Sequence, residues 1–308
     1  MAQQEQTNND SHRLPPAGPD QIYVKVAALN GGFLTLPERN FVTDPDPQKG
    51  TTVPSMCFLI EHPGKKGSTN TTARIVFDLG IKRDLTKYVQ PATQHHITTR
   101  QPVYSSADAR SSLLSGGLDP AKDIDYVILS HIHWDHIGLP SDYARSKFIV
   151  GSGTLYIVEN GAPHYPLERI EKGALPVDQT IELPPVPGSD RKHMAATAQT
   201  DHEWQSISTL PDAVDFFGDG SLWIIDAPGH IHGHVNAIMT GEKQILEYDN
   251  GQGKLKSAHA ELSKAKKTIE NVQELIQVNG GEVVEWIVAH DWKWASENQN
   301  RFFPRWMY

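Results

Sequence analysis

Short apolar runs recur along the chain, and most of them end at glycine, proline or charged residues, which is the pattern of buried β-strands. Two of these runs are separated by Thr-Gly-Glu-Lys at 240–243, and this spacing predicts a β-hairpin. Strands are expected at 22–26, 56–60, 73–77, 126–129, 147–150, 222–225, 235–239, 244–248 and 283–289.

One segment, 261–278, repeats its apolar residues with the period of an amphipathic helix. Lysine and glutamate occupy the opposite face, so we expect the apolar stripe to pack in the core rather than to form a groove for a partner. The stripe consists of Leu262, Ala265, Ile269, Val272, Leu275 and Ile276.

Strands in both halves of the chain, interrupted by helical or irregular segments, favour a layered α/β fold. The segments 82–118 and 160–215 are irregular, and connections of that length usually carry function or short helices of their own. Residues 1–20 are polar and contain prolines, so we expect a disordered arm there. A single domain is expected over 21–308.

Composition and charge narrow the class of protein. The chain has 308 residues, of which 38% are hydrophobic, enough for a sizeable core. A net charge of −9 without a basic stripe disfavours a nucleic-acid partner. A single cysteine, Cys57, excludes an intramolecular disulfide and a thiolate-rich metal site. Because neither a membrane span nor a signal-peptide pattern occurs, we expect a cytoplasmic protein without membrane association.

Residues 130–138 read Ser-His-Ile-His-Trp-Asp-His-Ile-Gly and directly follow the apolar run 126–129. Imidazole nitrogens and carboxylate oxygens are the donors that zinc and similar cations accept. The candidates here are His131, His133, Asp135 and His136. A loop that is merely rich in histidine would rarely place three of the 15 histidines and an aspartate in this pattern. The spacing therefore predicts a metal site.

Two further histidines also follow apolar strands. His230 comes just after a Pro-Gly turn that ends the run 222–225, and His290 ends the run 283–289. One histidine after a strand is more often a hydrogen-bonded structural residue than a ligand. Three such strand ends in one chain, however, indicate a shared edge of the sheet where ligands are held.

Together these motifs resemble those of the metallo-β-lactamase superfamily. The family pattern His-X-His-X-Asp-His is present at 131–136, its Pro-Gly-His turn at 228–230, and its late strand-end histidine as His290. Phe77-Asp78-Leu79-Gly80 is similar to the Asp-X-Gly that ends an early strand there. The resemblance covers about residues 22–291 and implies a four-layer αββα sandwich, the metallo-β-lactamase fold.

The resemblance also implies a ligand set for two metal ions per subunit, with zinc as the expected metal. The first ion would be held by His131, His133 and His230, and the second by Asp135, His136 and His290. Asp78 and Asp226 are expected to support the ligands or loop amides through hydrogen bonds. His232 and His234 are either partners of the ligands or structural residues near the turn.

Sites of this family normally contain an aspartate that bridges both ions, at the end of a strand after the Pro-Gly-His turn. The candidate is Asp249, which closes the run 244–248, although that run is less apolar than the family's strand. Gln252 stands where some lactonases carry a tyrosine that assists ring opening. The sequence leaves open whether Asp249 completes the bridge or whether the second site is incomplete.

Hydrolysis is the reaction that this chemistry favours. Two divalent ions that share a water lower its pKa towards neutrality, and the metal-bound hydroxide attacks a carbonyl that one ion polarises. Asp135, and Asp249 if it bridges, would carry the proton to the leaving group. No Gly-X-Ser-X-Gly nucleophile elbow occurs in the sequence.

The motifs are most similar to the lactonase-like branch, including its fungal lactamase- and lactonase-type members. This resemblance implies a small-molecule cyclic substrate, a cyclic amide, carbamate or ester, with benzoxazolinone-type detoxification as one form. An N-acyl homoserine lactone-type lactonase is the first alternative. A degenerate member that binds a metal or ligand without turnover is the alternative of another class.

Four aromatic residues are candidates for an apolar pocket that would hold a ring-bearing substrate: Trp134, Tyr165, Trp292 and Trp294. The alternative is that they are half-buried core residues, as tryptophans often are. The sequence indicates neither the ring size of the substrate nor the metal that is loaded nor the oligomeric state.

Overall fold

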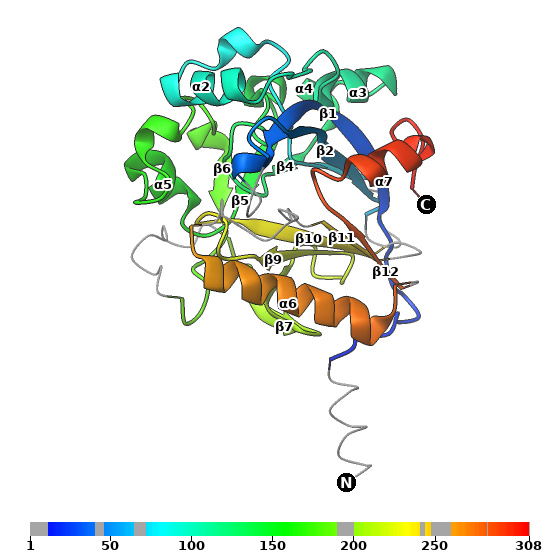
Figure 1. The fold of residues 1–308 in the computed structure, drawn as a ribbon. Coiled ribbons are helices and arrows are strands. Elements are labelled where there is room, and N and C mark those ends of the chain that lie inside the picture. The colour runs from blue at the N-terminus through cyan, green and yellow to red at the C-terminus, as the bar shows by residue number, and fades with distance from the viewer. Residues whose placement is uncertain are drawn as a thin grey trace.

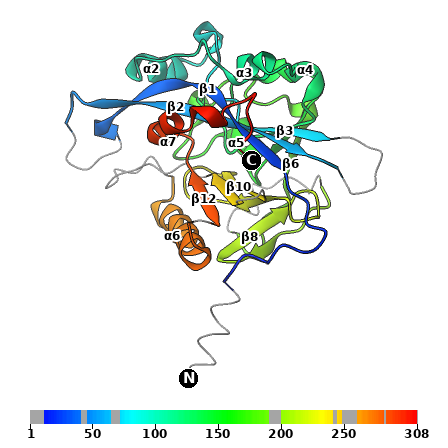
Figure 2. The ribbon, with the colours of Figure 1, turned by 90° about the vertical axis from the view of Figure 1, so that its right-hand side faces the viewer.

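The computed structural model of the chain describes residues 12–40, 46–64, 72–189, 200–240, 244–247, 260–281 and 283–307. Two β-sheets face each other in the middle of the molecule, and helices cover the outer side of each sheet (Figure 1). The view turned by 90° shows the same order of layers (Figure 2).

The first sheet has six strands: β1 (Lys25–Pro37), β2 (Gly50–His62), β3 (Ala73–Phe77), β4 (Tyr126–Ile128), β5 (Lys147–Val150) and β6 (Thr180–Glu182). The strands follow one another across the sheet in chain order. The first three pair antiparallel, whereas β3 to β6 are parallel. Because parallel strands end at the same edge, the segments that follow them emerge side by side.

The second sheet also has six strands: β7 (Gln205–Ile207), β8 (Leu210–Asp215), β9 (Leu222–Asp226), β10 (Val235–Thr240), β11 (Gln244–Glu247) and β12 (Val284–Ile287). The expected hairpin is confirmed, since β10 and β11 pair antiparallel. The last two strands are parallel, with Glu247 opposite Ile287. Both strands therefore end at one edge of this sheet.

The helices are α2 (Pro91–Thr99), α3 (Ala109–Ser115), α4 (Pro120–Asp123), α5 (Thr154–Asn160), α6 (Leu262–Asn279) and α7 (Trp292–Glu297). Helices α2 to α5 lie on the outer side of the first sheet, and α6 covers the second sheet (Figure 1). The predicted helix 261–278 is confirmed as α6. Among the helices of the described residues, none has the length and apolar character needed to cross a membrane.

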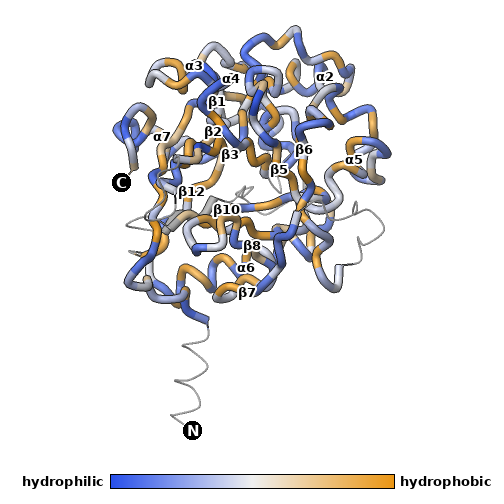
Figure 3. Tube along the Cα trace, turned by 180° about the vertical axis from the view of Figure 1, so that it is seen from behind, coloured by the Kyte–Doolittle hydropathy of each residue, from blue (hydrophilic) through white to orange (hydrophobic). Residues whose placement is uncertain are grey.

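The described residues form four buried apolar clusters, three of which lie between the four layers. Along β2, Met56 and Phe58 face the second sheet, whereas Cys57 and Leu59 face the helices, as the alternation of a strand requires. The third core joins the second sheet to α6, where Val272 is buried. Apolar stretches accordingly follow the strands between the layers, and the outer helices mix apolar and polar positions (Figure 3). The expected four-layer αββα sandwich is confirmed.

The strands that the sequence predicts least well lie at or next to the edges of the two sheets. The expected strand 22–26 overlaps β1 only at its start, because β1 begins at Lys25 and continues to Pro37. A bulge between Asn30 and Phe33 interrupts its register with β2. The irregular segments 82–118 and 160–215 contain α2, α3, β6, β7 and β8 within their bounds.

Of the arm expected over 1–20, the structure describes residues 12–20, which contact the second sheet and α6. Leu14 is 8% exposed and belongs to the core between the second sheet and α6. Its backbone N–H donates to Asn279 Oδ1 at 2.9 Å, and Ser208 Oγ donates to the carbonyl of His12. An apolar side chain with a place in the core thus orders this segment. The single domain expected over 21–308 stays a prediction.

Residues 302–307 run along the outer edge of β1. The Phe303 N–H donates to the Ala28 carbonyl at 2.9 Å, and the Met307 N–H donates to the Val26 carbonyl at 2.7 Å. Because β1 is the edge strand of the first sheet, this segment occupies backbone groups that would otherwise face solvent.

Two fully buried tyrosines differ in the bonding of their hydroxyl groups. The Tyr88 hydroxyl donates to the Trp134 carbonyl and accepts from the Lys82 N–H, both at 2.7 Å. The Tyr143 hydroxyl has no hydrogen-bond partner among the described residues. A buried polar group without a partner costs stability, whereas a bonded one contributes to it.

We therefore expect opposite effects when each hydroxyl is removed. Tyr88→Phe should lower the free energy of unfolding by about 1–3 kcal/mol, because it strands a buried carbonyl and a buried N–H. Tyr143→Phe should leave it unchanged or raise it by up to about 1 kcal/mol. Urea unfolding of the metal-free protein measures both values, and equal losses in the two variants would contradict the assignment.

Candidate metal centre

Three strand ends bring six of the seven expected ligand residues together in two groups. Residues 131–136 follow β4, His230 follows β9, and His290 follows β12. Within each group the candidate ligand atoms all lie within 4.8 Å of one another. The three-histidine cluster consists of His131, His133 and His230, and the aspartate cluster consists of Asp135, His136 and His290.

The three-histidine cluster converges on the Nδ1 atom of His133. This atom lies 2.9 Å from His131 Nε2 and 3.0 Å from His230 Nε2. Nitrogen ligands of tetrahedral zinc, with Zn–N bonds of about 2.0–2.1 Å, stand about 3.3–3.4 Å apart. The three nitrogens are thus close to the separations of a zinc site and need to spread only slightly to hold the ion.

In the aspartate cluster the ligand atoms surround the carboxylate of Asp135. Its Oδ2 lies 3.6 Å from His290 Nε2 and 3.9 Å from His136 Nε2. The two clusters adjoin, because the ring centroids of His131 and His136 are 4.2 Å apart. The structure therefore has the donors for two neighbouring cations.

Asp78 connects the two clusters from behind. Its carboxylate accepts from His136 Nδ1 at 2.7 Å and from the Ser130 hydroxyl at 2.6 Å. The Ser130 Oγ lies 2.9 Å from His131 Nδ1. One carboxylate thus orients a histidine of each cluster, so that the Nε2 atoms face the candidate ions.

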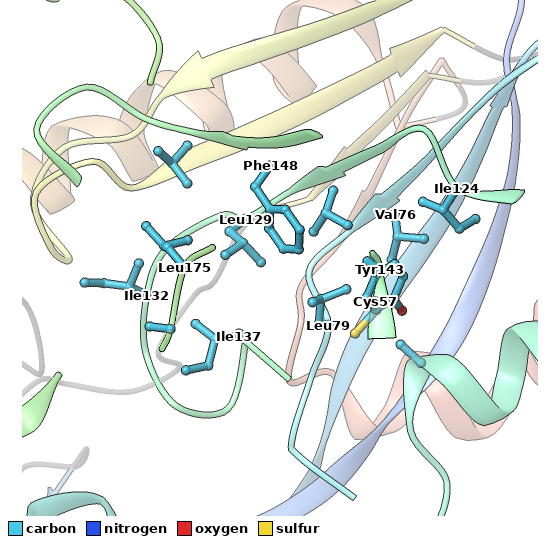
Figure 4. Packing of buried hydrophobic residues seen from close by; sticks show 14 of the residues in the cluster. Cys57, Val76, Leu79, Ile124, Leu129, Ile132, Ile137, Tyr143, Phe148 and Leu175 are labelled. Carbon is cyan, nitrogen blue, oxygen red and sulfur yellow. The ribbon is translucent and has the colours of Figure 1, made fainter. Parts of the chain in front are cut away.

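The apolar residues of the motif anchor its loop in the core. Ile132 and Ile137 are buried with Leu129 and Phe148 in the core between the first sheet and the helices (Figure 4). Between them, the Trp134 carbonyl accepts from the Tyr88 hydroxyl. Apolar and ligand residues alternate here because the loop packs one side against the core and presents the other to the clusters.

The turn that carries His230 is held by the start of α6. The N–H groups of Ala260 and Glu261 donate to the carbonyls of His230 and Gly229, at 3.0 and 2.8 Å. Gly229 has a φ of 123°, and a Cβ there would lie 2.2 Å from the Ala265 backbone nitrogen. Only glycine allows the helix to approach this closely.

His290 is oriented from β2. Its Nδ1 donates to the Pro54 carbonyl at 2.7 Å, which leaves Nε2 for the aspartate cluster. Ala289, the residue before His290, is also held by β2: its carbonyl accepts from the Met56 N–H at 2.9 Å. The first sheet therefore positions a ligand that the second sheet supplies.

Burial and neighbouring charges favour the ligand-competent states of two residues. Burial holds the pKa of His131 well below its ordinary value, and His136 and His133 lower it further, so the imidazole is neutral at pH 7. Burial alone would raise the pKa of Asp135, but His136 and His290 outweigh it and keep the pKa low. A neutral imidazole and an ionised carboxylate are the forms that bind cations.

Of the remaining expected site residues, His234 and Asp226 lie in the described structure. The His234 ring lies 5.0 Å from that of His131, with Nδ1 bonded to the Ala227 carbonyl, so it supports the turn. Asp226 ends β9 with its backbone paired to Val235. Asp249 and Gln252 lie outside the described residues.

The four aromatic residues lie in different parts of the described structure. Trp134 and Trp294 are buried, at 6% and 9% exposure, in separate cores. The Tyr165 ring lies 4.8 Å from that of His133, and its hydroxyl donates to the Arg169 carbonyl. Trp292 is 56% exposed. The sequence carried no signal for Tyr88, whose hydroxyl donates to the Trp134 carbonyl, or for Pro54, whose carbonyl accepts from His290.

Comparison with known proteins finds fungal relatives that are named as a metallo-hydrolase and a γ-lactamase. No protein-family model matches the chain. The metallo-hydrolase mfmC of Annulohypoxylon moriforme is 32% identical over 241 residues, covering 75% of this chain and 57% of that protein. The γ-lactamase FDB1 of Fusarium pseudograminearum is 30% identical over 185 residues, covering 60% of this chain and 40% of that protein.

The chain spans between about a quarter and somewhat less than two thirds of the length of the curated relatives that it matches. The smallest shares are of Penicillium proteins named as cytochrome P450 monooxygenases.

Among solved structures, an N-acyl homoserine lactone hydrolase with N-hexanoyl-L-homoserine at its catalytic metal centre superposes with a TM-score of 0.62. The two are 16% identical, and the match covers 93% of this chain and all of the other. At 16% identity this match shows a shared fold only. The similarity in sequence is to the fungal relatives. The chain is a homologue of fungal proteins named metallo-hydrolase and γ-lactamase, and its fold is the metallo-β-lactamase fold that its motifs predicted.

Proposed function

We propose that the chain is a metal-dependent hydrolase that opens a small cyclic amide, carbamate or ester. The observation that carries this proposal is the pair of adjoining clusters, each with three nitrogen or oxygen donors and both oriented by Asp78. A purely structural metal site is usually closed by four protein ligands, whereas three leave a position for water or substrate.

The donor set suits zinc, and we propose two ions per subunit. The three-histidine cluster would hold one ion and the aspartate cluster the other. When bound, such ions supply an acidified water and polarise a carbonyl of the substrate. The neutral His131 imidazole and the ionised Asp135 match the protonation states that this chemistry needs.

The chain's own residues orient the ligands and handle the proton. Asp78 fixes the rings of His131, through Ser130, and of His136. The Asp135 carboxylate points its Oδ2 towards His290 and His136 and is available to hold the proton that passes to the leaving group. We propose the same role for Asp249 if it bridges.

A lactam or cyclic carbamate is the substrate class that the γ-lactamase relative supports. A lactone of the N-acyl homoserine type is the second candidate, supported by the fold shared with the lactone hydrolase. Both reactions open a ring by attack on a carbonyl carbon and need the same centre. Benzoxazolinone and N-hexanoyl homoserine lactone represent the two classes in a hydrolysis assay.

The first test is metal content paired with hydrolysis. We expect two equivalents of zinc, and turnover of one of the two cyclic substrates but not of a linear thioester. His131→Ala should lose at least one equivalent of zinc. Its activity should fall by more than about 100-fold, because loss of a residue that only orients a ligand typically costs about 10–100-fold. His95→Ala, which removes an exposed histidine of α2, is the control.

Two outcomes would contradict the proposal. A folded protein that takes up no metal would exclude the assigned ligands. A protein that holds two ions but opens neither ring would identify a member that binds metal without turnover.

The second test addresses Asp78. Asp78→Asn should weaken metal binding at both clusters by about 10–100-fold, because the carboxylate orients a histidine in each. Asp219→Asn is a matched control, since Asp219 pairs with His62 at 2.9 Å, and neither residue belongs to the clusters. Competition with a chromophoric chelator measures the affinities. If Asp78→Asn affects only one ion, Asp78 does not connect the clusters.

The third test asks whether Asp249 completes the second site. Strand β11 ends two residues before Asp249, and the parallel β12 ends three residues before His290, with Glu247 opposite Ile287. This register supports Asp249 as a further ligand. Asp249→Asn should reduce zinc from two equivalents to one, whereas the exposed Asp178→Asn should retain both. Two equivalents at unchanged affinity in Asp249→Asn would rule the ligand out.

A further inference from the structure

A cavity of about 530 Å³ lies between the bulge of β1, the middle of β2 and helix α7. Helix α7 crosses beside these two strands (Figure 2). Cavities of this volume are within the range that holds small organic ligands. We call it the α7 cavity.

The walls of the α7 cavity are mainly apolar and aromatic. The large apolar residues that line it are Phe33, Pro54, Met56, Trp292, Phe302 and Phe303. The others are glycine, alanine or residues with hydroxyl and amide groups, and no lining residue carries an ionisable side chain. Aromatic walls favour a flat ring, and a charged ligand would lose its hydration without gaining a partner.

The cavity is separate from the candidate metal centre. None of the six residues of the two clusters lines it. Pro54 forms the partition, because it lines the cavity while its carbonyl accepts from His290 Nδ1. A molecule in the cavity therefore does not need a metal ion to bind.

We propose that the α7 cavity is a second binding site, for a neutral aromatic small molecule. Trp292 provides an open wall of this site, since it is 56% exposed beside the cavity. The hydroxyl and amide groups of the lining are suited to one or two polar atoms at the edge of the ring. This inference does not depend on the proposed hydrolysis.

Calorimetric titration with 2-naphthamide tests the site, with 2-naphthoate as the charged probe of the same shape. The neutral probe should bind one-to-one with a Kd below about 1 mM, as expected for a ligand of this size, and at least tenfold more tightly than the carboxylate. The affinity should agree within threefold between metal-free and zinc-loaded protein. Equal binding of both probes, or loss of binding on zinc loading, would overturn the proposal.

Two neighbouring residues of α7 provide matched variants. Ser296 lines the cavity and Glu297 does not, and both are exposed. Ser296→Phe should abolish binding of 2-naphthamide, whereas Glu297→Phe should preserve it. Trp292→Ala should weaken binding at least fivefold, with Lys293→Ala as its control. Binding that survives both Ser296→Phe and Trp292→Ala would mean that the probe sits elsewhere.

Discussion

The arrangement of the candidate metal centre depends on the hydrogen bonds that the Asp78 carboxylate accepts from Ser130 and His136. Asp78 lies at the end of β3 in a left-handed backbone conformation, with a φ of 59° that is uncommon for a residue other than glycine. That conformation is maintained because the side chain accepts from the Ser130 N–H, the Ser130 hydroxyl and His136. A backbone cost at one strand end is thus offset by three hydrogen bonds to the next.

Two of the ligand residues, His230 and His290, are not bonded to Asp78 and are positioned by other layers of the fold. His230 depends on α6: the two residues just before this helix bond the turn, and the close approach of the helix backbone requires Gly229. His290 depends on β2, through the Pro54 carbonyl. The two clusters therefore combine an outer helix and both sheets, and their geometry is a property of the packed sandwich rather than of any one motif.

Much of this centre could be predicted from local sequence, because continuous apolar runs mark β3, β4, β5 and β9. Asp78 follows β3, the histidine motif 131–136 follows β4, and the turn with His230 follows β9. What could not be predicted depends on pairing across the fold. The extension of β1 past Gly31 is stabilised by β2. The strands β6 and β7 have three residues each, too few for a period, and Pro211 and Asp212 interrupt the apolar pattern of β8. Tyr88 reaches the Trp134 carbonyl only after the loop has packed, so its own sequence carries no signal. Asp249 lies outside the described residues, and its place in the centre stays a prediction.

The pairing of residues 302–307 with β1 has a consequence for biosynthesis. β1 and its outer neighbour are far apart in the sequence, so β1 is synthesised long before residues 302–307. Until those residues have left the ribosome, the nascent chain presents an open sheet edge, a template for association with other chains. His290 is synthesised only shortly before them, so the covering of that edge and the assembly of the aspartate cluster become possible at nearly the same stage of translation.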